Sequence, residues 1–206
     1  MPSKHSSEAV NNKGANDPQS PDDTPSLEFI DMIDCQQVDE ITHCLTNPDC
    51  DVNKALQDLE TPLMRAVICA SQPGADDVYL QILRQLSRHR RIDVNLQTEG
   101  KCTALHVACG RSPQAGHSGV SQVRSSRVVK ILLQEKRCHV NLKDDDGLTP
   151  LMCATQQVTS SDDVAIVKLL LNHSKCDVNA VDYVGKAALS YACESSIIKS
   201  WCFVWP

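Results

Sequence analysis

The feature that most constrains this chain of 206 residues is one pattern that occurs four times in register. Each copy contains the dipeptide Val-Asn, and eight residues after the asparagine a short block begins that has Leu at its third position. The asparagines are Asn53, Asn95, Asn141 and Asn179, and the blocks begin at Thr61, Thr103, Thr149 and Ala187. A chain with such self-similarity is expected to fold into repeated units, each of which packs on its neighbours.

An amphipathic segment precedes each Val-Asn dipeptide. It begins thirteen residues before the asparagine, and its second and fifth positions are apolar, which places them on one face of a helix. These pairs are Ile41 and Cys44, Leu83 and Leu86, Val129 and Leu132, and Val167 and Leu170. Each unit is therefore predicted to contain a helix that ends shortly before the dipeptide.

The blocks after the dipeptides have the chemistry of a helix start. In two of them Thr is followed by Pro, at Thr61-Pro62 and Thr149-Pro150. A Thr side chain caps free backbone N–H groups, and Pro suits the first helical position. Gly147 and Gly185 stand two residues before a helix start, as a tight turn requires. We therefore predict that every unit is a helix, a turn, a second helix and an extended hairpin link.

With these features the sequence resembles the ankyrin repeat family, whose repeat of about 33 residues contains the motif T-P-L-H-x-A. The matching segments are residues 61–66, 103–108, 149–154 and, more weakly, 187–192. The resemblance covers residues 27–193 and implies an all-α ankyrin-repeat solenoid of four to five divergent repeats. The predicted repeats span about residues 27–58, 59–100, 101–146 and 147–184, with a partial repeat at 185–196.

The units are longer than this family repeat. Successive helix starts are 42, 46 and 38 residues apart, and most of the excess falls between the two helices of a unit. The inserts lie around residues 71–77, 110–126 and 158–163 and are rich in Ser, Gly, Pro and Asp. They are predicted to be surface loops, because the entropy cost of closing a loop grows slowly with its length.

Two segments flank the predicted repeats. Residues 1–26 are rich in Ser, Pro and Asn with few apolar side chains, which predicts a disordered tail. Residues 194–206 form an atypical apolar carboxy-terminal tail, for which two interpretations stand equally. Either Ile197, Ile198, Trp201 and Cys202 form a helical stripe that completes a shortened last repeat, or the tail leaves apolar surface that favours partner binding or aggregation.

Composition argues against several classes of function. Lys and Arg total 20 against 26 Asp and Glu, a net charge of −6, so we expect no nucleic-acid partner. The sequence has neither an apolar run long enough for a transmembrane helix nor the apolar core of a signal peptide. Its eleven cysteines, an odd number without an export signal, predict reduced thiols in the cytoplasm or nucleus.

The residues that could bind a metal or catalyse a reaction are instead interpreted as parts of the fold. The cysteines recur at equivalent repeat positions and never as C-x-x-C, which favours core packing over metal binding. Asp144, Asp145 and Asp146 lack the ligand spacing of a calcium loop and are predicted to form a hairpin tip. The resemblance implies that His106 hydrogen-bonds neighbouring repeats. Without a phosphate loop or nucleophile motif, we predict that the chain is not an enzyme and binds no cofactor.

One basic run follows a predicted second helix. It consists of Arg84, Arg88, His89, Arg90 and Arg91. We interpret these cations as complementing the carbonyl end of the helix, rather than as a nuclear-import or nucleic-acid patch. This basic run would be extended by Arg111, Arg124 and Arg127 only if the fold brought those residues close to it.

The function predicted from this resemblance is that of a monomeric, non-catalytic module that binds a protein partner. The family resemblance implies a concave surface made by the hairpin tips and the exposed faces of the first helices. The candidate partner-binding residues are Gln57, Asp58, Arg65, Thr98, Glu99, Lys101, His106, Asp144, Asp145, Asp146, Met152, Asp182, Tyr183 and Lys186.

Two alternatives remain open from the sequence. The chain could be an adaptor or targeting fragment of a larger multidomain protein that acts through its tail and its insert at residues 110–126. It could also be an enzyme or metal protein on the same scaffold, which needs a ligand or nucleophile cluster that the sequence does not show.

Overall fold

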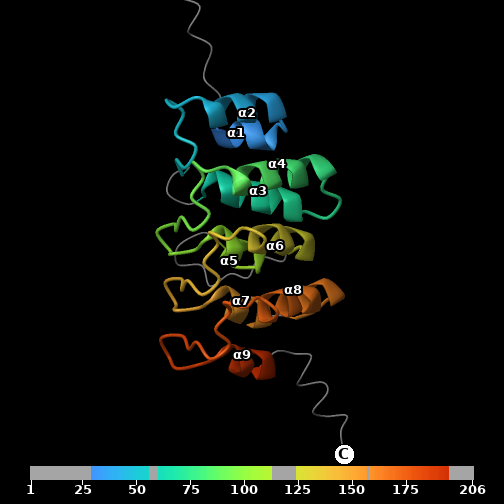
Figure 1. The fold of residues 1–206 in the computed structure, drawn as a ribbon. Helices are drawn as coiled ribbons and strands as arrows, with labels where there is room; N and C mark the ends of the chain where they lie inside the picture. The colour runs from blue at the N-terminus through green and yellow to red at the C-terminus, as the bar shows by residue number, and fades with distance from the viewer. Residues whose placement is uncertain (1–28, 56–59, 113–123, 157, 195–206) are drawn as a thin grey trace, which may run out of the picture.

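The computed structural model of the chain describes residues 29–55, 60–112, 124–156 and 158–194. In these residues helices stack in pairs into an elongated solenoid, and the links between pairs project from one side of the stack, at the left of Figure 1. The described residues contain no β-strand, although an isolated antiparallel bridge joins Val181 and Ala187. The predicted all-α solenoid is confirmed. The predicted tails lie outside the described residues, apart from Glu194, which ends a helix.

The helices alternate between the two positions predicted for each repeat. The first helices are α1 (Phe29–Asp34), α3 (Pro62–Ser71), α5 (Ala104–Ala108), α7 (Pro150–Gln156) and α9 (Ala188–Glu194). The second helices are α2 (Val38–Thr46), α4 (Asp77–Arg88), α6 (Ser126–Leu133) and α8 (Ser161–Leu171). The predicted helix start at Pro62 is confirmed, because the Thr61 hydroxyl accepts a hydrogen bond from Met64 N. The predicted loop at residues 158–163 is shorter than expected, since α8 begins at Ser161 with Asp163 in its first turn.

The core is built from aliphatic side chains, small residues and thiols. Leu63, Leu105 and Leu151 of the first helices are all buried. Cys109 is buried as well, and burial raises the pKa of its thiol, as expected for a packing residue. Cys193 differs from this pattern because it is exposed on α9, which packs against α7. Repeat position therefore predicts the burial of a cysteine only where a following element covers it.

The Val-Asn asparagines join each repeat to the next. Asn95 Nδ2 donates to the Arg137 carbonyl at 2.8 Å, and Asn95 Oδ1 accepts from His139 N at 2.7 Å. Asn53 and Asn141 make the same two bonds to the loop of the repeat that follows them. These asparagines form a polar ladder along the stack, which explains why this residue recurs in register.

An arginine after the second helix closes the carbonyl end of a neighbouring helix. Arg91 Nη1 donates to the Cys44 and Leu45 carbonyls, each at 3.3 Å, and thus binds the end of α2. Arg137 repeats this arrangement one unit later, donating from Nη2 to the Ser87 carbonyl in the last turn of α4 at 2.9 Å. The sequence interpretation assigned such cations to carbonyl ends, but for Arg91 the helix belongs to the preceding repeat.

The arginines of the long insert do not enlarge the basic run. Arg124 Nη1 lies 3.6 Å from Asp163 Oδ1, and Arg127 Nη2 lies 2.8 Å from Asp77 Oδ1 at the start of α4. Arg111 pairs with carboxylates of the following hairpin. Each of these arginines thus holds a carboxylate of another element. None of the described helices is long and apolar enough to span a membrane.

Candidate functional site

The hairpin link before α7 is shaped by an aspartate inside the turn. Asp144 Oδ1 accepts hydrogen bonds from Asp146 N at 3.0 Å and from Leu148 N at 2.8 Å. Gly147 completes the turn with a φ of 80°, a left-handed conformation that favours glycine. Because Asp144 is fully buried, its side chain stabilises the turn and does not face a partner.

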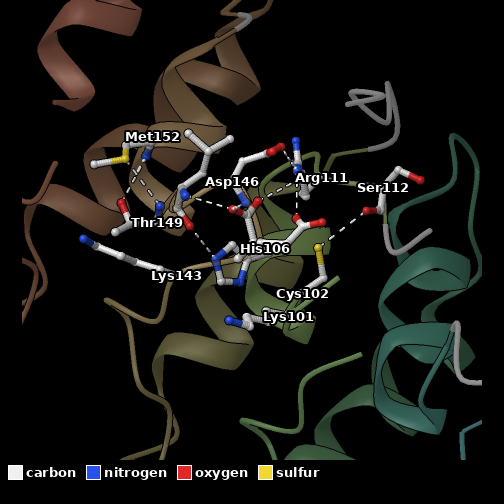
Figure 2. A network of polar contacts seen from close by, with 12 residues as sticks. Lys101, Cys102, His106, Arg111, Ser112, Lys143, Asp146, Thr149 and Met152 are labelled. Carbon is white, nitrogen blue, oxygen red and sulfur yellow. Dashed lines mark hydrogen bonds and ion pairs between the residues drawn. The ribbon is translucent and has the colours of Figure 1, made fainter. Parts of the chain in front are cut away.

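Arg111 neutralises this aspartate and its neighbours (Figure 2). The guanidinium follows α5, and its Nε lies 2.8 Å from Asp144 Oδ2 while its Nη2 lies 3.3 Å from Asp145 Oδ1 and also contacts Asp146. Burial raises the pKa of Asp144, and the Leu148 hydrogen bond and the charge of Arg111 oppose this effect. Oxygen atoms of the three carboxylates lie within 4.8 Å of one another. Here the cation beside them is the guanidinium of the chain itself.

His106 links α5 to the following hairpin. Its Nδ1 accepts from Thr103 N at 3.2 Å, and its Nε2 lies 3.1 Å from the Leu148 carbonyl, to which it donates as the Nε2–H tautomer (Figure 2). Burial lowers the pKa of His106 from 6.5 to about 4, so the imidazole is neutral at pH 7. The role between repeats that the resemblance implied is confirmed by this geometry. A surface role is wrong, because His106 has no exposed area.

Five of the predicted partner-binding residues lie in the interior. They are Thr98, His106, Asp144, Met152 and Asp182, each with at most 9% of its surface exposed. Their placement at a partner surface is wrong because three of them lie inside hairpin turns, His106 bonds to the next repeat, and Met152 is buried on α7. For example, Asp182 Oδ1 accepts from Val184 N and Lys186 N, as Asp144 does in its own turn. Gln57 and Asp58 lie outside the described residues.

Two predicted residues are half-buried and engaged in ion pairs. Arg65 on α3 donates from Nε and Nη2 to the two carboxylate oxygens of Asp34, both at 2.7 Å, and hydrogen bonding to Asp34 raises the pKa of Arg65. Lys186 Nζ lies 2.8 Å from Glu194 Oε1 and 5.5 Å from the centroid of the Tyr191 ring. Sequence reasoning missed Asp34 because the pair spans two repeats.

The remaining predicted residues are exposed at the ends of successive hairpins. We call this region the tip surface and define it by Glu99, Lys101, Asp145, Asp146, Tyr183 and its neighbour Val184. Val184 was not among the predicted residues, and it is 78% exposed. Because valine is apolar, the sequence alone does not suggest that Val184 is exposed.

Neighbouring tips contact one another directly. Asp145 N donates to the Gly100 carbonyl at 3.1 Å, and Gln97 Nε2 donates to the Lys143 carbonyl at the same distance. The following pair of hairpin tips, at Gly147 and Tyr183, is also in close contact. A Cβ added at Gly147 would lie only 2.7 Å from Tyr183 N. The three hairpins from residue 97 onward therefore form one continuous row.

Comparison with known proteins supports this architecture. Residues 116–202 match the family model for ankyrin repeats, described as three copies. A search of curated proteins gave no match. Helix pairs and asparagine ladders of the same kind continue through the residues before the matched segment. The family match over residues 116–202 and the repeated geometry before them together support an ankyrin repeat protein.

Proposed function

We propose that this chain is a monomeric, non-catalytic module that binds a protein partner through the tip surface. Ankyrin repeats generally mediate protein–protein interaction, and ankyrin repeat domains are typically non-enzymatic. The observation that carries the proposal is the row of contacts between tips, from Gly100 through Asp145 and Gly147 to Tyr183. A surface held in this way loses little conformational entropy on binding, which favours affinity.

The tip surface offers two kinds of chemistry side by side. Glu99, Lys101, Asp145 and Asp146 supply exposed charges, while Tyr183 and Val184 supply exposed apolar area. Arg111 neutralises part of the acidic charge from within, so a partner meets a moderate negative potential there. We infer that the partner carries a cationic side chain next to an apolar one. Tyrosine is among the residues that most often dominate the energy of an interface.

Capture with matched variants tests this proposal. The full chain serves as bait beside a tip variant with Glu99→Ala, Asp145→Ala and Tyr183→Ala. The control variant carries Arg84→Ala, Lys130→Ala and Lys168→Ala, which are exposed cations on second helices. Proteins retained by the wild type and the control but lost with the tip variant would support the tip surface.

Binding measurements with the purified partner then give the size of the affinity loss. We expect the tip variant to bind it at least about tenfold more weakly, which corresponds to about 1.4 kcal/mol. Binding should also weaken as salt is added, because the exposed charges are screened. Equal binding by the tip variant and the wild type, or loss with the control alone, would refute the proposal.

The adaptor alternative is tested in the same experiment. A bait without residues 1–26 would lose partners that bind through the tail, which lies outside the described residues. The composition argument for reduced thiols leads us to propose the cytoplasm or nucleus as the compartment, and fractionation of cells checks this.

A further inference from the structure

The last described repeat exposes side chains whose equivalents are buried in every earlier repeat. Leu63, Leu105 and Leu151 are 2%, 1% and 3% exposed, whereas Leu189 at the same position of α9 is 74% exposed. The Val-Asn valines behave in the same way. The first three are at most 4% exposed, and Val178 is 46% exposed. The stack thus presents an apolar end where α9 lies.

These side chains line a groove of about 190 Å³. We call it the end groove and define it by Leu151, Val167, Leu171, Val178, Leu189 and Ala192. Leu171 on α8 is 49% exposed, so both walls of the groove carry accessible apolar area. In the inner repeats α3 has α4 and α5 beside it, whereas α9 packs against α7 among the described helices. Within the described residues, the end groove therefore has the chemistry of a core surface, and no helix after α9 packs on it.

We propose that residues 195–206 of this chain dock in the end groove. They follow α9 directly, and Leu189 and Ala192 of α9 form one wall of the groove, so the segment begins beside its site. Its side chains are mainly apolar, including Ile197, Ile198 and Trp201, and its one charged side chain is Lys199. Apolar side chains from this segment would remove the exposed leucines from water.

Two further observations favour this occupant. The family match extends to residue 202, beyond the end of α9, so the repeat pattern itself includes most of the segment. A segment joined to the groove by a few residues also has a high effective concentration there, which a second copy of the chain does not have. The inference is independent of the tip surface, because it concerns the end of the stack.

Tryptophan fluorescence of the full chain is a direct test. Both tryptophans of the chain, Trp201 and Trp205, belong to the proposed segment. We expect the wild type to show blue-shifted emission that acrylamide quenches weakly. Leu171→Glu and Leu189→Glu place a charge on opposite walls of the groove, and each should shift the emission to the red and increase quenching severalfold.

A matched control uses a residue outside the groove. Val184 is an exposed apolar residue on a hairpin tip, and Val184→Glu should leave the emission unchanged. Leu171, Leu189 and Val184 are all exposed, so these variants are expected to keep their folds, which far-UV circular dichroism checks.

Three results would overturn the proposal. The first is water-exposed emission from the wild type, and the second is shielded emission that both groove variants leave unchanged. The third is shielding that appears only when the chain self-associates in sedimentation experiments, since this would assign the groove to a second copy. Shielded emission from a monomer, lost with either groove variant, supports docking of residues 195–206.

Discussion

Acid should destabilise this protein through one buried histidine. In the folded chain the pKa of His106 is about 4, because burial disfavours the imidazolium, whereas its ordinary value is 6.5. Protonation would also remove the acceptor at Nδ1 that holds Thr103 N. Between these two pH values the unfolded chain binds a proton at this site that the folded chain does not bind.

The sign and size of the effect follow from linkage. Histidine is charged when it is protonated, and the pKa of His106 is lowered in the folded chain. Above pH 6.5 both the folded and the unfolded chain hold His106 neutral, so it costs no stability there. As the pH falls from 6.5 towards 4, the free energy of unfolding decreases by up to about 1.4 kcal/mol per pH unit. His106 therefore removes about 3 kcal/mol by pH 4, a substantial part of the stability of an ordinary domain.

Urea unfolding followed by circular dichroism at a series of pH values measures this loss. His106→Gln keeps an amide donor towards the Leu148 carbonyl but does not titrate, so its stability should fall less steeply between pH 6.5 and pH 4. His139→Gln serves as the control, because that side chain is exposed, and it should retain the slope of the wild type. Equal slopes for the wild type and His106→Gln would refute the assignment of this acid sensitivity to His106.

Three other substitutions test the contacts between repeats, each by urea unfolding. Arg111→Met leaves a buried carboxylate unpaired and should cost about 3–5 kcal/mol. Asn95→Ala removes the two bonds to the Arg137 carbonyl and His139 N, with an expected loss of about 1–3 kcal/mol. Gly147→Ala puts a Cβ 2.7 Å from Tyr183 N at a positive φ, and we expect a loss of more than about 1 kcal/mol.

Each of these substitutions has a matched control. Adding Asp144→Asn to Arg111→Met should recover much of the loss, because the amide keeps the turn bonds without the charge. Asn179→Ala should cost little, since Asn179 is exposed and follows the last described helix pair. Gly74→Ala shares a positive φ but meets nothing within 4 Å, so it should cost less than Gly147→Ala. Equal losses within the asparagine or the glycine pair would contradict the contacts assigned here, as would a double variant no more stable than Arg111→Met alone.

Much of the fold is predictable from the sequence because its signals are local. The Thr-Pro pairs mark helix starts through an N-cap bond that spans three residues, as Thr61 and Met64 show. The fixed distance from each Val-Asn dipeptide to the next helix start sets the repeat, and the apolar pairs at helical spacing mark its second helix. These features depend on backbone chemistry within one unit, so they can be read without knowing what lies beside it.

The candidate site was less predictable because exposure depends on distant residues. Asp145 and Tyr183 are exposed as predicted, but Asp144 and His106 are buried by contacts that join successive repeats. The bond from His106 to the Leu148 carbonyl spans 42 residues, so no local pattern shows whether the imidazole faces solvent or the next repeat.

The end of the stack shows the same division. The sequence establishes that Leu189 occupies the position of Leu63, Leu105 and Leu151, and hence that the last unit belongs to the repeat series. Its exposure follows from the elements that pack around α9, and these are a property of the assembled solenoid. Helix starts, turns and repeat length are encoded within each unit, whereas burial, ion pairing and surface are set by the neighbour on which each unit stacks.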